Sequence, residues 1–135
     1  MPTQQEQFTN AALYARVSSD RQDVDLSVAA QLRALRDYAK KNGYLVAREY
    51  IDEAESGRIA DRPQFRKMLD EASATNAPFK EILVWKFSRF TRKREHAVAF
   101  KAMLRRRGIR VVSITEHADD TPTGKLMEAI IESVD

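Results

Sequence analysis

The sequence predicts an α/β protein in three layers, with a mostly parallel central sheet between helices. Four short apolar segments alternate along the chain with segments whose apolar residues recur at helical spacing. This alternation is typical of parallel strands joined by crossover helices. With 135 residues, the chain can bury the core of one domain and is too short for two domains of ordinary size.

The expected strands are the apolar segments at residues 11–17, 44–51, 81–85 and 110–114. In the first strand, alternation of side chains places Arg16 on the same face as Ser18. The opposite face receives three apolar residues, Leu13, Ala15 and Val17. Open α/β sheets place their sites at the carboxyl ends of strands, so Arg16 and Ser18 are expected at that edge.

Two helices are predicted before the third strand. The first spans residues 25–41, with Gly43 just beyond its end, and buries Leu32, Leu35 and Ala39. The second begins near Pro63, a residue favoured in the first turn of a helix. Its apolar residues at helical spacing are Phe65, Met68, Leu69 and Ala72.

Two further helices are predicted around the fourth strand. One spans residues 91–107, stops at Gly108 and turns three residues inward, Ala97, Phe100 and Leu104. The other starts near residues 121–124, and its apolar stripe over residues 126–134 is still in progress when the sequence ends. We therefore expect residues 11–135 to form a domain that is cut short, preceded by a flexible, polar arm at residues 1–10.

The composition is typical of a globular protein of the cytoplasm. Hydrophobic residues make up 43% and charged residues 32%, and no apolar run could span a bilayer. The absence of cysteine excludes disulfides, thiolate metal sites and a cysteine nucleophile. Lysine and arginine number 23 against 20 acidic residues, an excess too small to indicate nucleic-acid binding by itself.

A hydroxyl group beside a fixed guanidinium suggests a phosphate site at Arg16 and Ser18. Phosphoryl transfer spreads negative charge over the nonbridging oxygens, so its catalysis depends on positioned cations and a nucleophile in line. Arginine suits this task because its planar fork donates paired hydrogen bonds and keeps its proton.

Four motifs occur in order along the chain. The first is Tyr14-Ala15-Arg16-Val17-Ser18, and the second is Gln31. The third is Ser56-Gly57 followed by Asp61-Arg62-Pro63, and the fourth is Lys86-Phe87-Ser88-Arg89-Phe90-Thr91-Arg92. Together they resemble the catalytic domain of the serine recombinases, a family of resolvases, DNA invertases and large phage-type integrases. The resemblance runs from about residue 11 to the end of the chain and implies the three-layer, resolvase-like α/β fold.

The resemblance implies a role for each matched residue. Ser18 would attack a DNA phosphate to form a 5′-phosphoserine link and release a 3′ hydroxyl. The cations around that phosphate would be Arg16, Arg62, Arg89, Arg92 and Lys86. Gln31 would lie near the nucleophile, and the supporting residues would be Tyr14, Asp52, Ser56 and Ser88. Because the covalent link keeps the phosphoester energy, strands could be rejoined without ATP, metal or any other cofactor.

The resemblance also implies partners. The family acts on double-stranded DNA, and its subunits associate from dimers into a synaptic tetramer in the full-length protein. A long helix and a separate C-terminal DNA-binding domain follow the catalytic domain in the family. We expect a cytoplasmic, nucleoid-associated protein of bacterial or phage origin.

Plainer interpretations of the same residues stay open. Alone, Ser18 is more often a loop serine, and Ser19 is the nearest rival nucleophile. Arg16 and Arg62 could be surface residues, and Gln31 could be a polar residue on the outside of its helix. The arginines at positions 89 and 92 share one face if a helix has begun there, as a solvated basic helix start or as part of a site.

Two positions leave the chemistry open. Ser88 stands where the family most often has an aspartate, so the general acid and base are unassigned. This departure motivates the main alternative, a noncatalytic DNA-binding or assembly module with the recombinase fold; a nuclease or phosphatase is a weaker third hypothesis. Asp52 is expected to form a salt bridge with a catalytic arginine, in preference to a metal site with Glu53 and Glu55.

Overall fold

A four-stranded parallel sheet forms the centre of the protein in a computed structural model that describes residues 8–17, 26–53, 62–91 and 93–116. The strand order is β2-β1-β3-β4, and every neighbouring pair is parallel. The strands are β1 (Thr9–Arg16), β2 (Tyr44–Asp52), β3 (Glu81–Val84) and β4 (Arg110–Ser113). The predicted parallel sheet is therefore confirmed, with each strand within two residues of its expected bounds.

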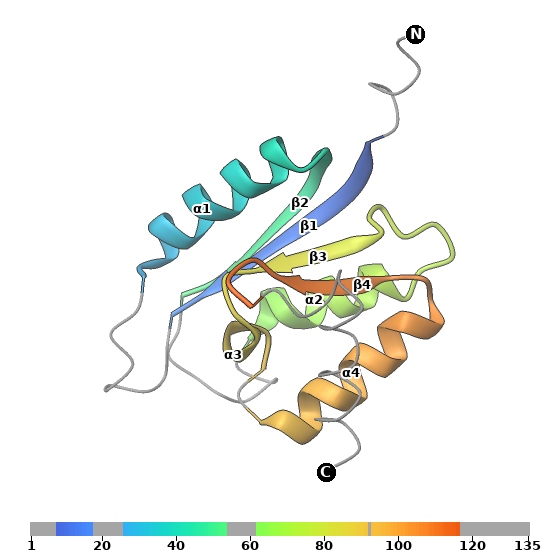
Figure 1. The fold of residues 1–135 in the computed structure, drawn as a ribbon. Coiled ribbons are helices and arrows are strands. Elements are labelled where there is room, and N and C mark those ends of the chain that lie inside the picture. The colour runs from blue at the N-terminus through green and yellow to red at the C-terminus, as the bar shows by residue number, and fades with distance from the viewer. Residues whose placement is uncertain (1–7, 18–25, 54–61, 92, 117–135) are drawn as a thin grey trace, which may run out of the picture.

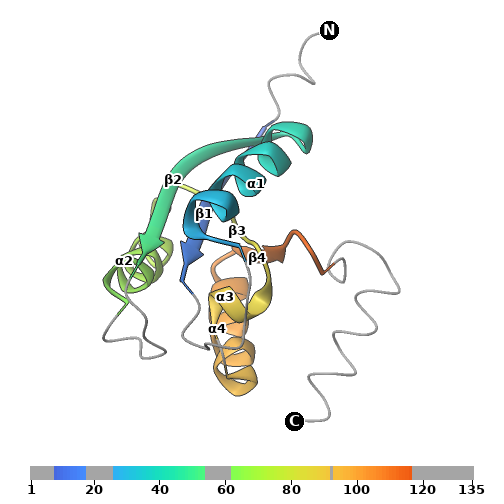
Figure 2. The same cartoon turned by 90° about the vertical axis from the view of Figure 1, so that its left-hand side faces the viewer.

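Helices cover both faces of this sheet, which gives the three predicted layers (Figures 1 and 2). On one face, α1 (Val28–Lys41) packs Leu32, Leu35 and Ala39 against Leu13 and Ala15 of β1. The other face carries α2 (Pro63–Ala72), α3 (Phe87–Phe90) and α4 (Arg94–Arg106). Its core includes Phe65, Met68, Ala72, Phe90 and Leu104.

The first helix begins three residues later than predicted, because a side-chain cap fixes its start. The hydroxyl of Ser27 accepts a hydrogen bond from the amide of Ala30 at 3.2 Å, which makes Ser27 the N-cap residue. The helix ends as expected: Asn42 is its C-cap residue, and Gly43 follows with φ of 78°, a backbone conformation that glycine adopts without strain.

The helix predicted over residues 91–107 is confirmed as α4 with a start three residues later, and a further short helix, α3, precedes it. The short helix α3 ends at Phe90, and Thr91 is extended with φ of −158° and ψ of 144°. Only at Arg94 does α4 begin. The helix that contains Arg89 ends at Phe90. Residue 92 and the helix predicted to start near residues 121–124 lie outside the described residues. Within the described ranges, every helix is too short or too polar to cross a membrane.

Candidate active site

Three arginines are almost completely buried at the carboxyl edge of the sheet. Arg16 ends β1 and is 1% exposed, while Arg62 and Arg89 are each 2% exposed. Arg62 directly precedes α2, and Arg89 lies within α3. Arginine is rarely buried unless its charge and donors are satisfied, so these three side chains are held by specific partners. The interpretation of these arginines as surface or solvated residues is wrong.

Arg16 binds the end of β1 to the short helix α3. Its Nε donates a hydrogen bond to the carbonyl of Arg89 at 3.0 Å, and its Nη2 donates to that of Ser88 at 2.6 Å. A third bond runs from Nη1 to the carbonyl of Val17 at 2.9 Å. As predicted, Leu13 and Ala15 share one face of β1, and Arg16 alternates with them; Tyr14 lies in the core of the other face.

Arg62 reaches the same helix from another element. Its Nη1 donates to the carbonyl of Phe90 at 2.8 Å, and its guanidinium carbon lies 3.9 Å from the centre of the Phe65 ring. The Nε of Arg62 is buried and has no hydrogen-bond partner within the described part of the chain. Side chains from β1 and from the start of α2 thus converge on three successive carbonyls, those of residues 88–90.

The shortness of α3 explains why these carbonyls accept bonds from arginines. The last four carbonyls of any helix lack partners within the helix, and α3 has only four residues. The Phe87 carbonyl accepts a helical bond from the amide of Thr91 at 3.0 Å. On its other side, α3 is capped by Glu116, whose Oε1 accepts the amide of Phe87 at 2.8 Å. The break at Thr91 therefore leaves acceptors available to Arg16 and Arg62.

Gln31 joins the site from the opposite face of the sheet. It is completely buried on α1, and its Nε2 donates to the carbonyls of Arg16 and Leu26, both at 3.0 Å. Its Oε1 is buried and has no hydrogen-bond partner among the described residues. The interpretation of Gln31 as a polar surface residue is wrong, and the amide holds the carboxyl end of β1.

Asp52 was predicted to form a salt bridge with a catalytic arginine, but the structure gives it hydrogen-bond partners of another kind. Its Oδ2 accepts the Tyr14 hydroxyl at 2.8 Å and the amide of Phe65 at 3.0 Å, and Oδ1 accepts the amide of Gln64 at 3.0 Å. Within the described residues it forms no ion pair with an arginine. Asp52 ends β2 beside the free amides of α2, whose own N-cap residue, Arg62, provides no side-chain cap.

Tyr14 remains a protonated donor at neutral pH. Burial raises the pKa of its hydroxyl far above the ordinary value; the nearby charge of Arg62 lowers this pKa, while the charge of Asp52 raises it. The hydroxyl therefore donates to the carboxylate and leaves Asp52 an acceptor. Among the residues that the structure describes, no group of three histidine, cysteine or acidic side chains is placed to hold a metal ion.

The remaining predicted residues divide into two groups. Lys86 and Ser88 are half-buried at α3. The carbonyl of Lys86 accepts a bond from the amide of Arg89 at 2.9 Å, and the carbonyl of Ser88 accepts one from the side chain of Arg16. Ser18, Ser56 and Arg92 lie outside the described residues.

The sequence analysis missed two contributors to this site. Glu116 was not singled out, and Phe65 was predicted only as a core residue. The spacing of Phe65 three residues after Arg62 is the signal that could have identified the stacking.

Comparison with known proteins identifies the family. Residues 11–135 match the family model described as Resolvase, N terminal domain, so the chain belongs to the resolvase family. The N-terminal catalytic domain of TP901-1 integrase is 25% identical, with 93% of this chain and 92% of that chain covered and a TM-score of 0.79. A resolvase family site-specific recombinase from Streptococcus pneumoniae has the same fold, at 24% identity, coverage of 92% and 86%, and a TM-score of 0.71.

A curated relative is much longer than this chain. It is a protein of Bacillus subtilis (strain 168) named "Putative DNA recombinase", and it is 27% identical over 120 residues. The match covers 88% of this chain and 23% of the relative, so the chain spans about a quarter of that protein's length.

Proposed function

We propose that this chain is the catalytic domain of a site-specific DNA recombinase that acts through a covalent serine link. The Ser18 Oγ attacks a DNA phosphorus, and the bond from that phosphorus to the 3′ oxygen breaks. The serine hydroxyl loses its proton, and the leaving 3′ oxygen gains one. The products are a 5′-phosphoserine and a 3′ hydroxyl, and the reverse attack by a 3′ hydroxyl rejoins the strand.

The observation that carries this proposal is the convergence of Arg16, Arg62 and Arg89 at one edge of the sheet. The guanidinium groups of Arg16 and Arg62 bond to the carbonyls of residues 88–90, and the third buried arginine, Arg89, belongs to this same turn. The buried Nε of Arg62 is a donor without a partner among the described residues, and a phosphate oxygen would satisfy it. Ser18 follows Arg16 by two positions, which is close enough in sequence to bring its hydroxyl to this edge.

We assign the roles accordingly. The charge that develops on the phosphate is stabilised by Arg62 and by three cations of the motif at residues 86–92, namely Lys86, Arg89 and Arg92. Arg16 adds charge and holds α3, while Gln31 holds the strand that leads to the nucleophile. The supporting set consists of Tyr14, Asp52, Ser56 and Ser88. In this proposal arginines take the place of a metal ion, and the covalent link makes ATP unnecessary.

The proposed partners are double-stranded DNA and further copies of the protein. Strand exchange requires breaks in two duplexes, so we propose that dimers of the full-length protein meet in a tetramer. The long relatives of this chain leave room for further domains, and we propose that a DNA-binding domain outside residues 11–135 selects the site.

The test is a search for the covalent adduct. The full-length protein is mixed with DNA that carries its recombination site, the reaction is quenched with denaturant, and the digested protein is analysed by mass spectrometry. We expect a nucleotide adduct on the peptide that contains Ser18. The adduct should disappear in Ser18→Ala and persist in Ser19→Ala, which removes the neighbouring hydroxyl as a matched control.

A specific observation favours one alternative function, a noncatalytic DNA-binding or assembly module. Ser88 replaces an aspartate that is usual in the family and cannot provide a charge. If the protein synapses its DNA without forming any adduct, and Ser88→Asp restores the adduct, the alternative holds for the natural sequence. An adduct in the natural protein excludes it.

A further inference from the structure

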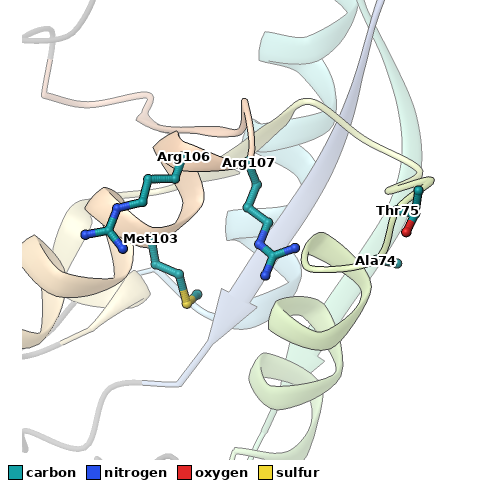
Figure 3. A pocket seen from close by; sticks show the side chains of 5 residues that line it. All are labelled: Ala74, Thr75, Met103, Arg106 and Arg107. Carbon is teal, nitrogen blue, oxygen red and sulfur yellow. The ribbon is translucent and has the colours of Figure 1, made fainter.

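A pocket of about 480 Å³ lies between the C-terminal ends of α2 and α4 (Figure 3). Its lining residues are Ala74, Thr75, Met103, Arg106 and Arg107. Both helices run antiparallel to the strands, so the pocket lies at the amino-terminal edge of the sheet. The eight residues of β1 separate the two edges by roughly 25 Å at about 3.3 Å per residue. This distance exceeds the Debye length of about 10 Å, so the pocket is electrostatically independent of the catalytic edge.

We propose that this pocket binds the sugar–phosphate backbone of a nucleic acid strand, with Arg106 and Arg107 on successive phosphates. The contact would be sequence-independent, because it reads no base edge. It does not rest on the proposed catalytic function, since it uses none of the residues assigned to that function.

Arg107 is fixed in place by a bond between the two helix ends. It is the C-cap residue of α4, and its Nη1 donates to the carbonyl of Ser73, the C-cap residue of α2, at 2.7 Å. Ser73 is the only partner of this guanidinium among the described residues. Because a guanidinium has five N–H donors, one bond orients the group without exhausting it.

Arg106 carries a charge that the described residues do not neutralise. Its side chain is exposed and has neither a hydrogen bond nor an ion pair within the described part of the protein. Figure 3 shows the two guanidinium groups pointing to different sides of Met103, whose half-buried side chain packs against the core. Two separated cations with an apolar group between them match two phosphates and the sugar that joins them.

The balance of charge favours an anion even after the helix ends are counted. Each helix C-terminus has a partial charge of about −0.5, so the ends of α2 and α4 together contribute about −1. Arg106 and Arg107 contribute two positive charges, which leaves about +1 in the pocket. None of the five lining residues is acidic. The volume lies within the range of about 300–1,000 Å³ that is typical of ligand pockets, and the Thr75 hydroxyl adds a donor.

The experiment titrates the isotopically labelled protein with single-stranded (dT)8 and follows the methyl signal of Met103 and the amide signal of Thr75 by NMR. We expect both signals to shift, with an affinity that falls as salt rises. Arg106→Gln should weaken binding about fivefold at low salt and reduce the slope of log K against log salt by about 0.7, the value for one single-strand phosphate contact. Arg107→Gln should have a similar effect on the slope.

Matched controls separate this site from charge effects elsewhere. Arg33→Gln removes an exposed arginine from α1 on the other face of the sheet and should leave the Met103 response unchanged. Arg106→Gln keeps the bond between Arg107 and Ser73, so the variant should fold normally and a change in its binding can be assigned to the lost charge. The proposal is overturned if Met103 and Thr75 do not shift, if Arg33→Gln has the same effect as Arg106→Gln, or if adenosine diphosphate binds there more tightly than (dT)8. The test for the Ser18 adduct is independent of all these outcomes.

Discussion

The two edges of the sheet use arginine in opposite ways. At the carboxyl edge Arg16, Arg62 and Arg89 are buried, and bonds to backbone carbonyls hold the first two. At the amino-terminal edge Arg106 and Arg107 are exposed at the end of a regular helix. Backbone acceptors, and not only acidic partners, can therefore make a buried cluster of cations possible.

The source of those acceptors is the irregularity of α3. A helix that continued without a break through residue 94 would have bound the carbonyls of residues 88–90 within itself. Because α3 stops after four residues, these carbonyls face Arg16 and Arg62 instead. At the end of the long helix α4, by contrast, Arg106 and the C-cap residue Arg107 are exposed to solvent.

The largest expected effect is loss of the buried arginine that ends β1. Arg16→Met leaves the carbonyls of residues 17, 88 and 89 without their donor, and charged hydrogen bonds contribute more than neutral ones. We expect the free energy of unfolding to fall by about 3 kcal/mol or more, measured by urea denaturation. Arg106→Gln at the exposed edge should change it by less than about 0.5 kcal/mol. Equal effects of the two variants would remove the contrast between the edges.

A somewhat smaller effect is expected from Asp52, which organises the buried edge without an ion pair to an arginine among the described residues. Asp52→Ala leaves the Tyr14 hydroxyl and the amides of Gln64 and Phe65 without an acceptor. At about 1 kcal/mol or more for each unsatisfied group, less any recovery by water, we expect a loss of about 2–3 kcal/mol in urea denaturation. The exposed neighbour provides the control, and Glu53→Ala should have almost no effect. A loss below about 0.5 kcal/mol for Asp52→Ala would show that the cap of α2 is dispensable.

The sequence predicted the parts of this site that depend on local pattern. Alternation in β1 correctly placed Leu13 and Ala15 on one face, and Pro63 correctly marked the start of α2. The order of apolar strands and helices was sufficient to predict the parallel sheet. Each of these features depends on a few neighbouring residues, and their spacing is visible in the sequence.

The sequence could not predict features that depend on contacts between distant elements. The helix predicted from residue 91 starts only at Arg94, because Thr91 is buried and extended where α3 packs against β1 and α2. The partners of Arg16 are backbone carbonyls, which every residue type has, so no motif could identify them. The Gln31 amide reaches the end of β1 from the opposite layer, 15 positions away in the chain. The positions of Ser18, Ser56 and Arg92 stay predictions.

The last expected effect is the loss of stability that accompanies ionisation of the buried Tyr14 hydroxyl, and this loss occurs only at alkaline pH. Because the pKa of Tyr14 is higher in the folded state than its ordinary value of 10.0, the folded protein binds this proton more tightly. The resulting stability is complete below pH 10 and is lost as the pH rises toward the folded-state pKa. At pH 11, one pH unit above the ordinary pKa, the free energy of unfolding should be lower by about 1.4 kcal/mol. This follows because one proton contributes about 1.36 kcal/mol for each pH unit.

Tyr14→Phe isolates this contribution. At neutral pH the variant should be less stable by about 1 kcal/mol, because the bond to Asp52 is lost. Between pH 9 and 11 the natural protein should lose stability faster than the variant, so their urea midpoints should converge. Tyr50→Phe, which removes the hydroxyl that donates to Glu71, should reduce the alkaline loss by a similar amount, because burial and this bond also raise the pKa of Tyr50. Parallel pH profiles for the natural protein and Tyr14→Phe would mean that Tyr14 ionises in the folded state as easily as in the unfolded one, and that the carboxyl edge admits water to the Tyr14 hydroxyl.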